Sequence, residues 1–250
     1  MTVAKYSANG NDFVVFHTFV NVDRRDLAKR LCHRQEGVGA DGLIVLLPHD
    51  TYDFAWQFYN ADGSEAAMCG NGSRAAAHYA FSHGLANATM RFLTGAGVIE
   101  ASVDGDVVTS ELTPPVVHRR DIEESGETWW LIDTGVPHLV SLRESVEAFD
   151  LEEAGRLRRK FDANVNVCAV EEGLLRVRTY ERGVEDETLA CGTGMAACFL
   201  RAREEGAAPE AMTVVPTGGE RLTLAVKGET LTLTGAVRHT FDAHIENLKI

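Results

Sequence analysis

Basic residues are scarce in this chain, which has 24 lysines and arginines against 37 aspartates and glutamates and a formal net charge of −13. Nucleic-acid-binding domains usually carry a basic patch or stripe, and none is visible in the sequence. The densest basic stretch, residues 156–160, is flanked by Glu152 and Glu153 and is typical of a solvated helix face. We therefore expect no nucleic-acid partner.

Long apolar runs are also lacking. No apolar stretch approaches the roughly 18 residues that a membrane-spanning helix needs, so we expect no membrane partner. Residues 1–6 lack the charged and apolar regions of a signal peptide. Five cysteines are an odd number, and nothing suggests secretion. Reduced thiols in a cytoplasmic protein are therefore expected in place of a disulfide framework.

Metal and cofactor motifs are missing or misplaced. No two cysteines have the C-x-x-C spacing, and no histidine pair with ligand spacing lies near Cys69 or Cys191, so we expect no metal site. Residues 37–42 match G-x-G-x-x-G, but a dinucleotide-binding loop must follow a strand and open a helix. Here the order is reversed. The pattern favours a turn that needs positive φ, and no cofactor is expected.

The chain does contain a four-residue phrase, Cys-Gly-x-Gly, that occurs twice. Cys69-Gly-Asn-Gly and Cys191-Gly-Thr-Gly lie 122 residues apart, and each follows a strand-like segment. Each opens a helical run that ends at a glycine fifteen residues after the cysteine, at Gly84 and Gly206. We interpret the repeat as an internal duplication of one structural unit.

A cysteine at a helix N-terminus is a better candidate for a reactive thiol than a cysteine elsewhere in the chain. The unpaired N–H groups and the helix dipole stabilise its thiolate, so its pKa is expected below the free value of about 8.5. Two such thiols facing each other across a cleft would suit an enzyme that inverts a stereocentre. Cys32, Cys168 and Cys198 lack this setting, and we expect them to be structural.

The remaining pattern predicts a mixed fold. Helices are expected over 23–34, 73–83, 150–161 and 195–205, and Pro114-Pro115 marks a boundary between the halves. Short apolar or alternating runs predict strands, namely 14–16, 43–47, 54–59, 90–93, 107–112, 174–180, 212–215, 222–226 and 230–234. The expected class is α/β (α+β), with two pseudo-symmetric domains that are each a curved mixed sheet or barrel around a central helix.

Several longer phrases together resemble the diaminopimelate epimerase family of cysteine-dependent amino-acid epimerases that need no pyridoxal phosphate. They occur in the family's order over almost the whole chain. The matching segments are Ala8-Asn9-Gly10-Asn11-Asp12-Phe13, Tyr59-Asn60-Ala61-Asp62-Gly63-Ser64, Met68-Cys69-Gly70-Asn71-Gly72-Ser73-Arg74, Gly135-Val136-Pro137-His138, Val165-Asn166, Tyr180-Glu181-Arg182-Gly183 and Ala190-Cys191-Gly192-Thr193-Gly194.

The resemblance implies conversion of LL-2,6-diaminopimelate to the meso isomer, in lysine and peptidoglycan precursor synthesis, by a homodimer. It implies a first domain over 1–115 plus 239–250 and a second over 116–238, with the active site in the cleft between them. Cys69 and Cys191 match the catalytic thiols, and His138 and Glu181 match residues that tune their protonation. The residues expected to bind substrate are Asn11, Asn60, Gly70, Asn71, Asn166, Glu181, Arg182, Gly192 and Thr193.

The chain departs from many members of that family at Val136 and Gly42, where they have polar side chains, and its 182–191 segment is one residue longer. Two alternatives stay open. One is a cysteine-based racemase of another amino acid, of the proline or histidine type. The other is a redox switch in which the glycine loops are plain turns.

Overall fold

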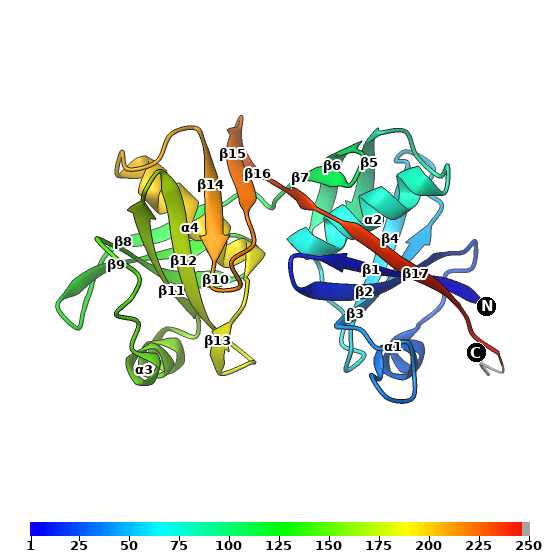
Figure 1. Cartoon of the computed structure of the whole chain (residues 1–250), viewed down its shortest axis with the longest axis horizontal. Helices are drawn as coiled ribbons and strands as arrows, with labels where there is room; N and C mark the ends of the chain where they lie inside the picture. Colours follow the sequence, from blue (N-terminus) through cyan, green and yellow to red (C-terminus); the bar gives the residue numbers. More distant parts are fainter. Residues whose placement is uncertain (247–250) are drawn as a thin grey trace. The chain divides into compact units, whose positions relative to one another are not determined.

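The computed structural model describes residues 1–246, and the chain divides into two compact units. Unit 1 consists of Met1–Glu111 and Gly235–Ile250, and unit 2 of Leu112–Thr234. Residues 247–250, the end of the first predicted domain, lie outside the described part. Each unit is a mixed sheet with two helices (Figure 1).

Unit 1 contains helices α1 and α2 and most of the strands that surround them. Its elements are β1 (Thr2–Ala8), β2 (Asn11–His17), α1 (Arg25–Cys32), β3 (Gly42–Leu47), β4 (Phe54–Asn60), α2 (Gly70–Ser82), β5 (Thr89–Thr94), β6 (Gly97–Asp104), β7 (Val107–Glu111) and β17 (Arg238–His244).

Unit 2 contains α3 and α4. Its elements are β8 (Val116–Glu124), β9 (Glu127–Asp133), β10 (Pro137–Arg143), α3 (Leu151–Phe161), β11 (Asn164–Glu171), β12 (Leu174–Glu181), β13 (Asp186–Thr188), α4 (Gly192–Glu204), β14 (Ala211–Pro216), β15 (Leu222–Lys227) and β16 (Thr230–Ala236), whose last two residues belong to unit 1.

The strand pairings of the two units correspond one to one. In unit 1, β1–β2 is antiparallel, β2–β3 parallel, β3–β4 antiparallel and β4–β5 parallel. In unit 2, β9–β10, β10–β11, β11–β12 and β12–β14 repeat this order of directions. The flanking antiparallel pairs β17–β1 and β8–β9 also match. The predicted class and its internal duplication are confirmed.

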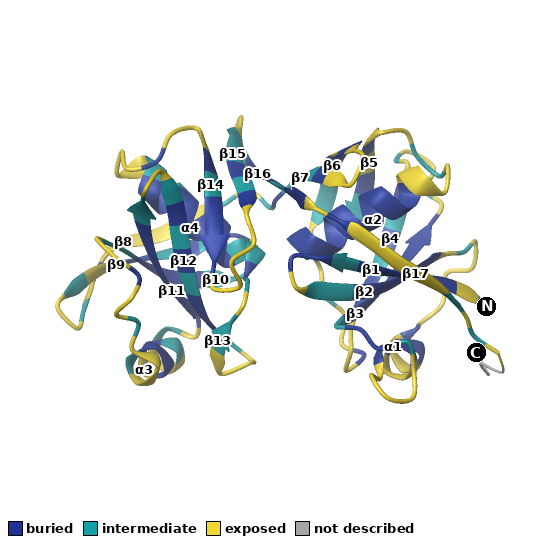
Figure 2. Ribbon diagram, viewed as in Figure 1, coloured by how far each residue is buried: buried dark blue, intermediate teal, exposed yellow. Residues whose placement is uncertain are grey.

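Strand β3 shows why its sequence is apolar without alternation. Leu43 and Val45 pack into a cluster with Leu27 and Leu31 of α1. Ile44, on the other face of the strand, packs into a second cluster with the alanines of α2. Both faces of the sheet are therefore covered, and a strand buried on both faces needs no polar side. The same arrangement makes α2 a central helix, which is buried along most of its length (Figure 2).

The outer helices differ from the central ones because each has an exposed face (Figure 2). The N-cap of helix α3 is Asp150, whose carboxylate accepts hydrogen bonds from the N–H groups of Glu152 and Glu153 at 2.9 and 3.1 Å. This N-cap satisfies two of the four unpaired donors of the first turn. The C-cap is Asp162, whose φ of 49° is left-handed. Acidic residues at the start and basic residues in the last turn complement the helix dipole.

The G-x-G-x-x-G segment lies between α1 and β3, as the reversed order predicts. Gly39 has a φ of +77°, which a residue with a side chain rarely adopts. At Gly42, an added Cβ would lie 2.7 Å from Cε2 of Phe58, so this tightly packed strand position leaves no room for a side chain.

Candidate functional site

The thiol of Cys69 occupies the N-cap of α2 in unit 1. Its backbone is extended, with φ −150° and ψ 119°, and its Sγ accepts a hydrogen bond from the N–H of Gly72 at 3.4 Å. The side chain is half-buried. An N-cap sulfur that already accepts an N–H donor is suited to carry negative charge, because the first turn of the helix offers further donors.

The thiol of Cys191 occupies the equivalent N-cap of α4 in unit 2. Its backbone is extended in the same way, with φ −128° and ψ 108°. Its Sγ lies 3.4 Å from Oγ1 of Thr193, and the residue is 9% exposed. Both cysteine phrases are therefore helix starts, and in each the cysteine is the N-cap residue. The helices begin at the glycine that follows each cysteine, three residues before the predicted starts.

The fourth residue of the second phrase must be glycine because other groups approach it closely. A Cβ on Gly194 would overlap Oδ1 of Asn166 and would lie 3.2 Å from Oγ1 of Thr179 and 3.3 Å from Cε1 of His138. The first turn of α4 thus lies directly against the side chains of β10, β11 and β12. In the sequence, this close contact is indicated only by the presence of glycine at position 194.

In unit 1 a polar network holds the first turn of α2. Asn71 donates to Oδ1 of Asn11 at 2.6 Å, and Arg74 donates to Oδ1 of Asn71 at 2.7 Å and to the carbonyl of Gly70 at 3.0 Å. Arg74 is fully buried and also donates to Oδ1 of Asn9. Arg74 was not among the site residues predicted from sequence, although a charged residue inside an alanine-rich helix is a signal that it has buried partners.

The same network continues to the surface through Asp41. Asn11 donates from Nδ2 to Oδ2 of Asp41 at 3.2 Å, and Arg34 donates to Oδ1 of Asp41 at 2.7 Å. Arg34 also makes two hydrogen bonds to Asp12, and Lys5 makes a third at 2.7 Å. Although burial alone would raise it, these cations hold the pKa of Asp12 down at about 2. The candidate ligand Asn11 is therefore fixed at both ends of its amide.

Asn60 is the most exposed of the predicted binding residues in unit 1. It ends β4 and donates from Nδ2 to Oγ of Ser64 at 2.9 Å, while its N–H donates to the carbonyl of Ser64 at 2.8 Å. Ser64 in turn donates to Asp62 at 2.6 Å. The Asn-Ala-Asp-Gly-Ser phrase is thus a compact turn that directs the Asn60 side chain outward from the end of the strand.

His138 of β10 is completely buried, and burial lowers its pKa to about 3. Its Nδ1 lies 3.0 Å from Nδ2 of Asn166. Asn166 is also completely buried, and its Oδ1 accepts a hydrogen bond from Thr179 at 2.9 Å. As it lies here, the Asn166 amide is bonded to protein groups on both sides.

Glu181 ends β12 and Arg182 begins the turn that follows, on the approach to the second cysteine phrase. Burial raises the pKa of Glu181 above its usual value. The N–H of Arg182 donates to Oδ1 of Asn164 at 2.7 Å, and its guanidinium donates to the carboxylate of Asp162 at 3.1 Å. Asn164, which was not among the residues predicted from sequence, lies two residues before the predicted ligand Asn166 and is buried. Both asparagines point to the same face of β11 because strand side chains alternate.

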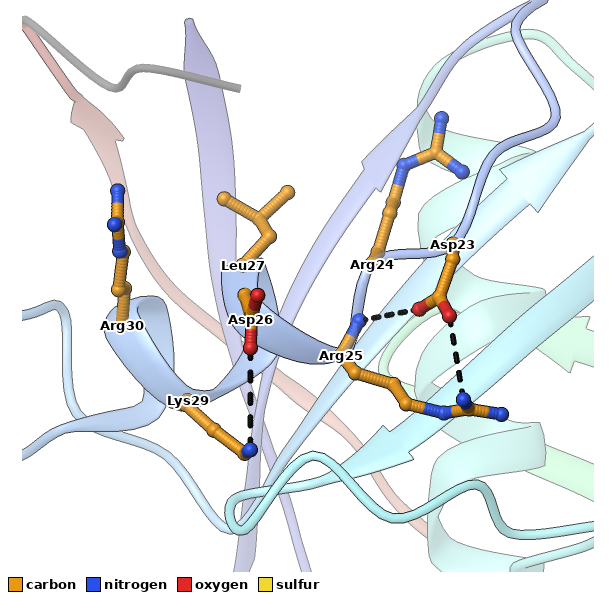
Figure 3. Close-up of a pocket in the computed structure, with 7 residues that line it drawn as sticks. All are labelled: Asp23, Arg24, Arg25, Asp26, Leu27, Lys29 and Arg30. Atoms are coloured by element: carbon orange, nitrogen blue, oxygen red, sulfur yellow. Dashed lines mark hydrogen bonds and ion pairs between the residues drawn. The ribbon is translucent and has the colours of Figure 1, made fainter.

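A hollow of the described chain lies elsewhere, beside α1. It has a volume of about 440 Å³ and is lined by residues of one segment, Asp23, Arg24, Arg25, Asp26, Leu27, Lys29 and Arg30 (Figure 3). Its charged side chains neutralise each other locally, as in the Asp23–Arg25 pair at 3.3 Å and the Asp26–Lys29 pair at 3.9 Å. None of the predicted site residues lines it.

The described residues also bear on metal binding and on membrane insertion. No cluster of three or more histidine, cysteine, aspartate or glutamate side chains in these residues has the arrangement of a metal site. Within the same residues, no helix is both long and apolar enough to cross a membrane.

Comparison with known proteins gives one consistent answer. The model of the family described as diaminopimelate epimerase matches residues 3–117 and 130–240. A diaminopimelate epimerase of Nitratiruptor sp. is 64% identical over 249 residues, which cover 99% of this chain and 100% of the relative. One of Campylobacter jejuni subsp. doylei is 51% identical over 245 residues, covering 98% of each chain.

Among solved structures, a probable proline racemase from Agrobacterium radiobacter has a similar fold. Its TM-score is 0.77 at 14% identity, with 98% of this chain and 93% of that chain covered. This likeness concerns the fold alone. The sequence matches span both halves and both cysteine phrases, and on that evidence this chain belongs to the diaminopimelate epimerase family.

Proposed function

We propose that this protein is the isomerase that its relatives' name describes, inverting one α-carbon of LL-2,6-diaminopimelate to give the meso isomer in lysine biosynthesis. The observation that supports the chemistry is the matched placement of Cys69 and Cys191 at the N-caps of α2 and α4, two topologically equivalent helices. In this proposal the two units close on the substrate, with one cysteine on each side of the reacting carbon.

The two thiols share the proton transfer. One thiolate removes the α-proton, and the opposite thiol supplies a proton to the other face, so the α-carbon inverts. The first cysteine ends as a thiol and the second as a thiolate, and the reverse reaction exchanges their roles. A single base that returned its proton to the face it came from would retain configuration.

The difficult step is the loss of a proton from a carbon with no cofactor to spread the charge. Negative charge then develops on the reacting carboxylate, and N–H groups placed in advance lower the energy of that state. Gly70, Asn71, Gly192 and Thr193 would supply these donors from the first turns of α2 and α4. Exclusion of water strengthens such interactions because it lowers the local dielectric constant.

The distal amino-acid group of the substrate needs its own ligands. We assign this task to Asn11, Asn60, Glu181 and Arg182, with Asn164 beside Arg182. They combine amide groups, a carboxylate and a guanidinium, which together can bind both an ammonium and a carboxylate. Asn166, which was also predicted from sequence to bind substrate, is assigned no substrate contact in this proposal, because its amide is bonded to His138 and Thr179.

Isotope incorporation tests the two-base scheme. In D2O, LL-diaminopimelate should yield meso product with deuterium at the inverted carbon, and the product should be followed by chiral chromatography and mass spectrometry. Cys69→Ala and Cys191→Ala should each abolish epimerisation. Rapid turnover by either variant would refute the assignment of the bases.

Substrate range separates this proposal from the racemase alternative. LL-diaminopimelate should be inverted, whereas proline and histidine, which lack a second amino-acid end, should not. Racemisation of either at a comparable kcat/KM would place the protein with the single-centre racemases. Activity in the presence of a reductant would exclude a disulfide switch as the sole function.

A further inference from the structure

The buried amide of Asn166 can take only one of its two orientations. Its Nδ2 faces two backbone carbonyl oxygens, those of Leu139 at 3.4 Å and Asn164 at 3.5 Å. Its Oδ1 accepts the hydroxyl proton of Thr179 at 2.9 Å. Turning the amide over would set its oxygen against both carbonyl oxygens, with no proton between them. The nitrogen is therefore the atom that faces His138.

This orientation determines which nitrogen of His138 carries the proton. Nδ2 of Asn166 lies 3.0 Å from Nδ1 of His138, and an amide nitrogen can only donate. Nδ1 must accept, so it has no proton of its own. In a neutral imidazole the proton is then on Nε2. A second proton on Nδ1 would oppose two N–H groups at a fully buried position.

Nε2 is the atom of His138 that the protein leaves available. It is buried and finds no hydrogen-bond partner among residues 1–246. Buried polar atoms of this kind are rare in native proteins and need an explanation. A donor held ready for a group that arrives during the reaction is one, and it fits a residue that lies against the first turn of α4.

We propose that Asn166 and Thr179 are positioning residues that hold His138 as the neutral Nε2–H tautomer, so that His138 acts as a hydrogen-bond donor and not as a base. The target of that donor rests on the proposed function and is a catalytic thiolate. A hydrogen bond from Nε2–H stabilises a thiolate, whereas an Nδ1–H tautomer would present a lone pair to it and repel it. No proton leaves His138 during the cycle.

The tautomer can be measured without substrate. Protein labelled with 15N-histidine should show, for His138, a protonated Nε2 and an unprotonated Nδ1 in long-range 1H–15N spectra at neutral pH. The spectrum of His138→Gln identifies its signals among those of the nine histidines. An Nδ1–H tautomer or an imidazolium in the unmodified protein would overturn the proposal.

Two variants test the cause. Asn166→Asp replaces the donor by a carboxylate acceptor, so the proton should move to Nδ1 and kcat should fall at least tenfold while KM changes less than threefold. Thr179→Val frees Oδ1 of Asn166 and should give a mixture of tautomers with lower kcat, whereas Thr179→Ser should restore both. If Asn166→Asp does not fold, the Thr179 pair decides the matter by the same readouts.

The outcomes distinguish the positioning role of Asn166 and Thr179 from the proposed function of the protein. An unchanged tautomer in both Asn166→Asp and Thr179→Val would refute the positioning role. Changed tautomers with unchanged kcat would refute the donor role of His138. An unmodified protein with the expected tautomer but no epimerase activity would refute the proposed function and leave the tautomer assignment intact.

Discussion

Nδ2 of Asn71 donates a 2.6 Å hydrogen bond to Oδ1 of Asn11, which joins the first turn of α2 to the start of β2 across 60 residues of sequence. Asn71 is one of the proposed donors to the reacting carboxylate, and Asn11 is a proposed ligand of the distal group. The two ends of the proposed substrate site in unit 1 are therefore parts of one network, which Asp41 extends by accepting from the other side of the Asn11 amide.

This network predicts a binding defect from a residue outside the substrate site. Asp41→Ala removes the charged acceptor that orients the half-buried Asn11 amide, and a hydrogen bond to a charged group contributes about 1.5–3 kcal/mol. If that energy is lost from substrate binding, kcat/KM should fall roughly tenfold to a hundredfold, mostly through KM. Steady-state kinetics with LL-diaminopimelate should show it. Asp50→Ala, at an exposed loop position of unit 1, should leave the kinetics unchanged.

The two glycines of the second cysteine phrase provide a matched stability test. A Cβ on Gly194 overlaps Oδ1 of Asn166, whereas a Cβ on Gly192 would lie 3.6 Å from Cδ2 of Leu233, an ordinary contact. Overpacking a filled interior costs about 1–3 kcal/mol. Gly194→Ala should therefore lower the free energy of unfolding in urea by that amount, while Gly192→Ala should stay near the original value. Equal effects would show that the first turn of α4 can shift away from β11.

The overall architecture was predicted from the sequence more successfully than the individual strands were. The central helices were predicted because alanine-rich runs end at glycine, and β3 because it is entirely apolar. Eight strands of the described part were not predicted, namely β1, β6, β8, β9, β10, β11, β13 and β17. In β8 and β17 most residues are exposed, so their polar sequences have no apolar alternation. Strand β17 is defined by its antiparallel pairing with β1, at the opposite end of the sequence.

The candidate site was only partly predictable for a similar reason. The helix starts at the two cysteine phrases could be predicted, because a helix start depends on residues that are adjacent in the sequence. The Asn166–His138 and Asn11–Asp41 contacts join residues 28 and 30 positions apart on separate elements, and no local pattern encodes them. The choice between Asn164 and Asn166 likewise depends on which neighbours each side chain meets in the folded sheet.

Thiol chemistry should single out the candidate catalytic cysteine of unit 1. Burial raises the pKa of Cys32 to about 12 and raises that of Cys198 as well, whereas Cys69 is half-buried and its sulfur accepts an N–H group. Because the thiolate is the reactive form, a small excess of iodoacetamide at pH 8 should alkylate Cys69 before Cys32, Cys168 or Cys198.

Peptide mass spectrometry at several times measures the order of alkylation, and denatured protein should react at all five cysteines. Loss of activity should follow modification of Cys69. Earlier modification of Cys32 or Cys198 in folded protein would contradict the burial on which this prediction rests.

His138 should also make the stability of the fold sensitive to acid. Because burial lowers its pKa to about 3 in the folded protein, it stays neutral between pH 3 and 6.5, while in the unfolded chain it takes up a proton below about 6.5. Proton uptake by the unfolded state favours unfolding, so the stabilisation is complete above pH 6.5 and is lost as the pH falls. Arg182, whose positive charge also lowers this pKa, acts in the same direction.

The size of the effect follows from the two pKa values. Between pH 7.5 and 5.0 the unmodified protein should lose about 2 kcal/mol more unfolding free energy than His138→Gln, because about 1.4 kcal/mol corresponds to each pH unit below 6.5. Urea unfolding of both proteins at the two pH values measures the difference. His118→Gln, on an exposed position of β8, should retain the full loss. An identical pH dependence for His138→Gln would mean that His138 is protonated equally in the folded and unfolded states, contrary to its complete burial.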